Sequence, residues 1–178
     1  HDATLERMNA ASGRLDERGA AELGTITLTG GTDTIPSLRQ MLDQIGGKVP
    51  VLIEVKSARS KGGSRGRVSS LCLAVRRELE GYQGHAAVMS FDPRVVRWFA
   101  DHSPMTVRGL VVTEEHAKAL GGMIRRRLSL WHARPDFLAY DIRDLPSRFP
   151  LGQRRRGLPL LTWTVRSAEH RERAEEYT

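Results

Sequence analysis

The stretch PVLIEVKS, residues 50–57, indicates how the chain folds. It is apolar enough to form a buried strand, yet Glu54 and Lys56 lie inside it or at its end. Two residues apart along a strand, the carboxylate and the ammonium point to the same side. The stretch therefore predicts a strand whose charged side chains gather at its carboxyl end.

The rest of the chain repeats this pattern of apolar runs separated by helical stretches. Strands are expected at residues 49–55, 86–91, 107–112, 136–142 and 158–165. Helices are expected at residues 35–45, 67–82, 92–102, 114–128 and 167–177. Asp92 followed by Pro93, and Ser167, are typical helix starts. Strands that alternate with helices, each apolar along its length, predict a parallel α/β sheet covered on both faces.

Polar residues cluster where the expected strands end. They are Glu54, Lys56, Ser90, Asp92, Thr113, Glu114, Asp141, Thr162 and Thr164. In a parallel β/α barrel, the carboxyl ends of the strands form the functional face. A complete barrel has eight strands and about 250 residues, whereas five strands are expected here. The chain is thus either an open five-stranded sheet or a barrel whose first two strands and last strand lie outside this sequence.

Six short segments resemble motifs of the glycerophosphodiester phosphodiesterase family, in the same order. HDATLERMNAASGRL (1–15) resembles the family's HD-x-TL-x-R segment, and LIEVKS (52–57) is similar to its E-(I/V)-K motif. The others are AAEL (20–23), TIPSLRQML (34–42), VMSFDP (88–93) and LLTWTV (160–165). Met8 and Arg166 depart from the usual pattern, which has Thr and Asn there. The resemblance covers essentially the whole chain.

The resemblance implies an incomplete (β/α)8 TIM barrel, with residues 1–178 as one partial domain. It implies an enzyme of lipid and glycerol metabolism that hydrolyses small glycerophosphodiesters to an alcohol and glycerol 3-phosphate, using Mg²⁺ or Ca²⁺. The family's first histidine and its Glu-x-Asp carboxylates have no counterpart in this sequence. We therefore expect these 178 residues alone to be inactive.

By the same resemblance, His1 and Lys56 are the expected catalytic residues and Glu54 the expected metal ligand. Lys56, Trp163 and Arg59 are the expected substrate-binding residues. The chemistry of these groups agrees with the roles. Carboxylate oxygen suits a hard dication, an ammonium binds phosphate, and a histidine can protonate a leaving alkoxide near neutral pH.

Other interpretations of these residues stay open. Glu54 and Lys56 alone would equally suit a plain ion pair, and Trp163 could line the mouth or fill the barrel top. The loop 57–67, with Arg59, Lys61, Arg65 and Arg67, would form an electrostatic funnel for an anion or a solvated loop. Asp2 and Arg7 are expected to be structural. The other histidines are expected at the surface or in packing: His85, His102, His116, His132 and His170.

The composition excludes several classes of protein. No window approaches the ~20 apolar residues of a membrane span, so no stable membrane insertion is expected. The net charge is +7, with arginine runs at 125–127 and 154–156. Aromatic residues are only 6% of the sequence and no nucleic-acid motif surrounds the arginines, so we expect solvated surface and no nucleic-acid binding. The single cysteine, Cys72, fits a buried residue in a cytoplasmic protein.

Two alternative functions also fit the sequence. A lysophospholipase D-like enzyme acting on larger lipids would use a similar site with a more apolar mouth. A non-catalytic barrel would keep the fold as a binding module.

Overall fold

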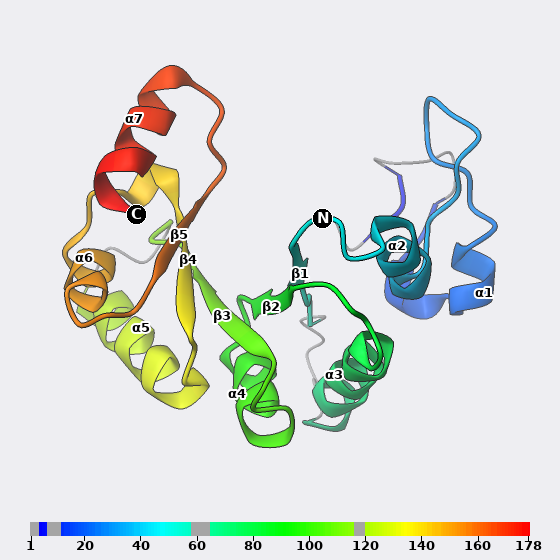
Figure 1. Cartoon of the computed structure of the whole chain (residues 1–178), viewed down its shortest axis with the longest axis horizontal. Helices are drawn as coiled ribbons and strands as arrows, with labels where there is room; N and C mark the ends of the chain where they lie inside the picture. Colours follow the sequence, from blue (N-terminus) through cyan, green and yellow to red (C-terminus); the bar gives the residue numbers. More distant parts are fainter. Residues whose placement is uncertain (1–3, 7–11, 58–64, 116–119) are drawn as a thin grey trace.

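Five parallel strands form one sheet in the computed structural model, which describes residues 4–6, 12–57, 65–115 and 120–178. The strands are β1 (Val51–Glu54), β2 (Ala86–Ser90), β3 (Val107–Val112), β4 (Phe137–Asp141) and β5 (Leu160–Trp163). They lie in the order β1-β2-β3-β4-β5, and every neighbouring pair is parallel. The sheet curls into part of a barrel (Figure 1). The predicted parallel α/β class and the positions of all five strands are confirmed.

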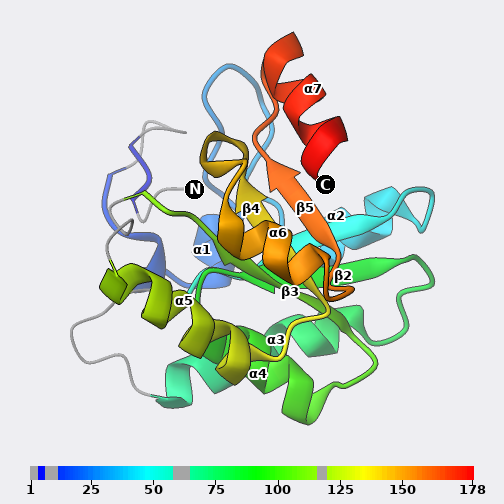
Figure 2. The same cartoon turned by 90° about the vertical axis from the view of Figure 1, so that its left-hand side faces the viewer.

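Helices connect the strands along the outer, convex side of the curled sheet (Figures 1 and 2). They are α3 (Arg65–Leu79), α4 (Pro93–His102), α5 (Leu120–Ala133) and α6 (Arg148–Arg154). Beyond β1 lie α1 (Ala20–Leu23) and α2 (Leu38–Ile45), and beyond β5 lies α7 (Ala168–Tyr177) (Figure 1). Two 3-10 turns complete the described elements, at Leu15–Glu17 and Ile142–Asp144. Within the described ranges, none of the helices combines the length and the apolar character needed to cross a membrane.

Side-chain caps fix where several helices begin. Asp92 accepts a hydrogen bond from the backbone N–H of Arg94, and Pro93 occupies the first turn, as predicted. Ser167 caps α7 in the same way, again as predicted. The helix expected at 35–45 begins only at Leu38, because Ser37 and Gln40 form a reciprocal capping box. α5 is shifted relative to the expected 114–128, because Glu114 and Glu115 precede the helix and its last turn reaches Ala133.

The main core lies between the convex face of the sheet and its helices. Val55, Val88 and Phe99 belong to one buried cluster, and Leu110, Leu138 and Tyr140 to a second. Cys72 is fully buried in the first cluster, as predicted, and burial raises the pKa of its thiol to about 12. The thiol is therefore a packing group.

The concave face of the sheet carries a smaller buried cluster. Ala87, Val111, Ala139 and Phe137 pack there with Trp163. At the two edge strands, Leu52 and Leu161 remain 45% and 44% exposed. Among the five strands only β4 is buried at every residue. The expectation that every strand is covered on both faces is therefore wrong, because the helices that lie against the sheet cover its convex side.

Candidate active site

Glu54 and Lys56 lie on the concave side of the sheet, at the carboxyl end of β1. Val55, between them, packs into the helix-covered core, so its two neighbours point the other way. The Lys56 Nζ and Glu54 Oε1 atoms are 3.8 Å apart, and both side chains are partly exposed. The charged pair therefore belongs to the mouth of the curled sheet.

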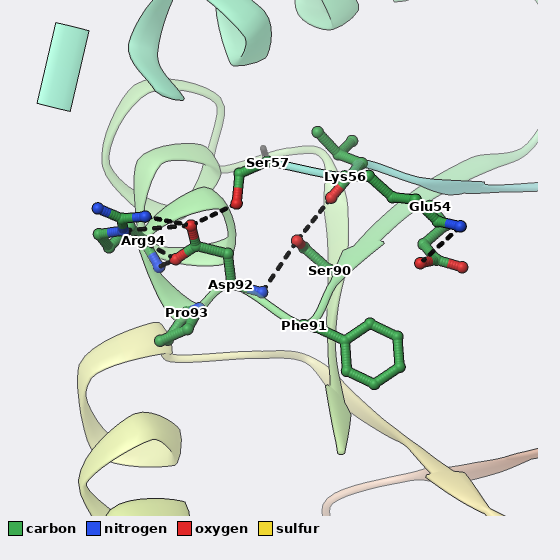
Figure 3. Close-up of a pocket in the computed structure, with 9 residues that line it drawn as sticks. Glu54, Lys56, Ser57, Ser90, Phe91, Asp92, Pro93 and Arg94 are labelled. Carbon is green, nitrogen blue, oxygen red and sulfur yellow. Dashed lines mark hydrogen bonds and ion pairs between the residues drawn. The ribbon is translucent and has the colours of Figure 1, made fainter. Parts of the chain in front are cut away.

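A cavity of about 540 Å³ opens beside this pair. Its walls come from the carboxyl ends of β1 and β2 and from the start of α4 (Figure 3). The lining residues are Glu54, Val55, Lys56, Ser57, Ser90, Phe91, Asp92, Pro93 and Arg94. Ser90, Asp92 and Glu54 are residues that the sequence pattern placed at strand ends. The cavity thus forms where a parallel barrel would build its site.

Asp92 holds one wall of the cavity together. Its Oδ2 accepts hydrogen bonds from Ser57 Oγ at 2.6 Å and from the Arg94 guanidinium at 2.7 Å. Burial alone would raise the pKa of Asp92, but the hydrogen bonds from the Arg94 side chain, Ser57 and the Arg94 backbone hold that pKa below its usual range. Asp92 is therefore ionised at neutral pH, and both of its oxygens are already engaged by the wall.

Ser90 ties the ends of β1 and β2 to each other. Its buried Oγ donates to the carbonyl of Val55 at 2.6 Å and accepts from the backbone N–H of Asp92 at 3.1 Å (Figure 3). A serine at this place fixes the end of β1, where Glu54 and Lys56 lie, against the turn in which Asp92 begins α4.

Trp163 links this cavity to a second one. Its ring meets that of Phe91 edge to face, with the centroids 5.8 Å apart. On its other side it borders a cavity of about 300 Å³ between the ends of β4 and β5. That cavity is lined by Asp141, Ile142, Arg143, Trp163, Thr164, Arg166 and His170. Trp163 therefore both packs the concave face and lines the mouth, the two positions left open by the sequence.

The second cavity repeats the local motif of the first. Asp141 ends β4 and accepts from the backbone N–H of Arg143 at 2.9 Å and from its guanidinium at 2.6 Å. Burial would raise the pKa of Asp141, but these bonds to Arg143, with a smaller effect of the charge on His170, lower it. The sequence pattern predicts a role for Asp141 but not for Arg143. Both cavities contain the same Asp-x-Arg pattern, DPR at 92–94 and DIR at 141–143, and this repeat could have identified Arg143.

His1, Arg59 and Lys61, which were expected at the site, lie outside the described residues. So do Asp2 and Arg7, expected to be structural, and His116, expected at the surface or in packing. Glu114, one of the polar residues expected where a strand ends, follows β3 but lies on the convex side, where it accepts from Tyr140 and Ser147. His170, expected to be a surface or packing residue, borders the second cavity. Across the part of the chain that the structure describes, no three His, Cys, Asp or Glu side chains form a group that could hold a metal ion.

Comparison with known proteins gives a consistent result for the fold. No family model matches the sequence, and neither does any curated protein. Among solved structures, an Oleispira antarctica phosphodiesterase in complex with the product sn-glycerol-3-phosphate matches with a TM-score of 0.76 at 18% identity. The match covers 99% of this chain and 70% of that one. The fold is that of glycerophosphodiester phosphodiesterases.

Two further structures of this phosphodiesterase fold agree. Putative glycerophosphoryl diester phosphodiesterases from Agrobacterium tumefaciens and Silicibacter pomeroyi match with TM-scores of 0.78, at 17% and 18% identity. Each match covers 99% of this chain and 71% of the solved one. The chain therefore corresponds to a large part of the phosphodiesterase barrel.

Proposed function

We propose that this chain belongs to an enzyme that hydrolyses glycerophosphodiesters to an alcohol and glycerol 3-phosphate. The observation that carries the proposal is the position of Glu54 and Lys56. They lie together on the concave side of the sheet, at the carboxyl end of β1, beside a cavity of about 540 Å³. The likeness to phosphodiesterase structures, including one that contains glycerol 3-phosphate, supports the same chemistry.

The cavity suits a small phosphodiester. Its volume lies within the range of about 300–1,000 Å³ that small-molecule sites occupy. Lys56 supplies a cation that can bind the phosphate, while Phe91 and Trp163 give the mouth an aromatic wall. Asp92 and Ser90 act as positioning residues, because their hydrogen bonds go to the wall itself.

We propose that Glu54 is one ligand of a divalent cation, Mg²⁺ or Ca²⁺. A carboxylate oxygen is the ligand type these ions prefer, and such an ion polarises phosphoryl oxygens when it is bound. Asp92 fits this role poorly, since its oxygens are engaged by Ser57 and Arg94. The described residues therefore fit the metal only in part, and its other ligands would come from outside them.

Two further roles fall on residues outside the described ranges. We propose that His1 protonates the departing alcohol, because an imidazole gives up and takes up a proton near neutral pH. Arg59, five residues after Glu54 in the sequence, would bind the substrate. Because one carboxylate is a poor site for a cation that takes about six oxygens, the 178 residues alone are expected to be inactive.

The experiment uses the complete protein that contains this chain, with glycerophosphocholine and either Mg²⁺ or Ca²⁺. The expected result is multiple-turnover release of glycerol 3-phosphate that EDTA stops and added metal restores. Release of phosphocholine in place of glycerol 3-phosphate would mean that the other ester bond is cleaved. No release from any glycerophosphodiester, with the protein folded, would favour a binding module.

A further inference from the structure

The outward face of α5 is apolar, which is unusual for a helix on the surface of a sheet. Its exposed side chains include Leu120, at 69% exposure, and Trp131, at 76%. Met123, Ile124 and Leu128 are exposed as well. Leu120, Ile124, Leu128 and Trp131 follow each other at helical spacing, so they line one face. We call these five residues the α5 stripe.

The inward face of the same helix carries an arginine. Arg126 is buried, with its guanidinium 3.8 Å from Glu114 Oε1 and 5.8 Å from the ring centroid of Phe149 on α6. Ala133 is the other fully buried residue of the helix. Glu114 is itself held by Tyr140 and Ser147. These contacts fix the rotation of α5, so the α5 stripe cannot turn towards the core.

The polarity of α5 is therefore reversed, with a charge inside and large apolar groups outside. Scattered exposed apolar residues are ordinary, but a contiguous apolar face marks an interaction surface. α5 lies on the convex side of the sheet, flanked by α4 and α6 (Figure 2). The concave side, with the candidate active site, is therefore left free when the outer side of α5 is in contact with a partner.

The charges around the α5 stripe select the kind of partner. Arg125 and Arg127 are exposed on the same helix. No acidic residue occurs anywhere between Glu115 and Asp136 in the sequence. Leucine, tryptophan and arginine on one exposed helix are typical of segments that lie in a membrane interface. A tryptophan ring is at home at the level of lipid head groups.

We propose that the outward face of α5 is a peripheral docking surface for a bilayer that contains anionic phospholipid. The alternative occupant is a second copy of this chain. A two-fold interface places the same patch against itself, which would bring Arg125 and Arg127 of both copies together without an acidic partner on the helix. An anionic lipid surface complements those charges. The arginine run at 125–127 was expected to be plain solvated surface, which is wrong for Arg126, because it is buried beside Glu114. The exposed Arg125 and Arg127 acquire a role in docking, while the run at 154–156 does not.

Vesicle flotation tests this proposal without reference to catalysis. The 178-residue chain should float with vesicles in which about a third of the phosphatidylcholine is replaced by phosphatidylserine, and much less with phosphatidylcholine alone. Trp131→Ala should weaken binding at least about tenfold, because the ring loses its apolar burial. Arg125→Gln with Arg127→Gln should weaken it roughly 25-fold, since each arginine near an anionic surface contributes about fivefold. Raising the salt concentration should reduce this second effect.

Matched controls test whether binding depends on the α5 stripe itself or on any exposed apolar or positively charged side chain. Met105 is 93% exposed outside α5, so Met105→Ala should leave binding unchanged. Arg155→Gln with Arg156→Gln removes two exposed arginines of the other run and should have little effect. Circular dichroism should show every variant folded, because all the altered side chains are exposed.

Three results would overturn the proposal. If the folded wild-type chain stays in the soluble fraction at every phosphatidylserine content, the membrane is not its partner. Equal binding by wild type and Trp131→Ala would place the lipid contact elsewhere. A concentration-dependent dimer that Trp131→Ala dissociates, without vesicle binding, would assign the α5 stripe to a second copy of the chain.

Discussion

The ring of Phe137 on β4 lies over Gly109, its register partner on β3. A Cβ atom added to Gly109 would overlap Phe137 Cε2 and Cζ. Real Cβ atoms do not approach other atoms so closely. Gly109 therefore leaves the space in which Phe137 packs on the concave face, beside Val111 and Ala139.

Replacing this glycine should destabilise the sheet. Gly109→Ala is expected to lower the free energy of unfolding by about 1–3 kcal/mol, because the ring has to leave its place in a packed layer. Urea denaturation would measure the loss. Gly152→Ala in α6 is the control, since nothing lies within 4 Å of its Cβ position. Introducing Phe137→Ala into Gly109→Ala should cost less than the sum of the single changes. Strict additivity would contradict the contact.

Glu54→Gln should abolish metal-dependent hydrolysis in the complete protein and leave the fold intact. The amide keeps the shape of the carboxylate and removes the charge that binds a dication. Turnover and metal affinity would be measured together. Glu78→Gln is a matched control, because Glu78 makes an ion pair with Arg39 and does not line the cavity. If Glu54→Gln hydrolyses the substrate at the wild-type rate at ordinary metal concentration, Glu54 is not part of the site.

Asp92 should make the free energy of unfolding depend on pH at acidic pH. Its folded pKa is lowered, so the stabilisation is present at neutral pH and is lost as the pH falls through that pKa, below about 4. Asp92→Asn keeps an N-cap but removes the charge that pairs with Arg94. We expect the variant to be about 1–2 kcal/mol less stable at pH 7.

The difference in unfolding free energy between wild type and Asp92→Asn should shrink towards pH 3. Denaturation at a series of pH values would show this. Asp33→Asn, at an exposed position, is the control. A difference that stays constant from pH 7 to pH 3 would mean that the charge of Asp92 does not stabilise the cavity wall.

The cations of residues 57–67, of which Arg65 and Arg67 lie in the first turn of α3 and not in the expected loop, should matter for capture of the substrate more than for its chemistry. Changing Arg59, Lys61, Arg65 and Arg67 together to glutamine should lower kcat/KM at low salt, and the loss should shrink at high salt. Steady-state kinetics at several salt concentrations would measure it. The control alters four exposed arginines elsewhere: Arg77, Arg155, Arg156 and Arg171. A large loss in kcat that salt does not change would instead place one of these four cations on the phosphate.

The sequence predicts the sheet well because its signals are local. Apolar runs mark the strands, and Asp92, Pro93 and Ser167 mark helix starts through contacts with their own neighbours. It also places Glu54 and Lys56 correctly at a strand end. The side of the sheet on which Glu114 lies is not a local property, since it depends on Tyr140 and Ser147, about 30 residues away.

Two other features escape sequence reasoning for the same reason. From the sequence alone, the apolar face of α5 would be predicted to pack on the core. The position of Arg126 beside Glu114 shows that the opposite side of the helix is the buried one. The space over Gly109 exists because Phe137 is its register partner, and register emerges only when the strands pair.

The order of the strands in space equals their order in the chain. During synthesis from the amino end, each new strand therefore meets an edge that has just been formed, and it becomes the edge for the strand that follows. β2 needs only β1 to be present, and β3 needs only β2. Partly synthesised chains can thus acquire parallel pairing one β/α unit at a time, so a pause in translation leaves a shorter sheet with native register.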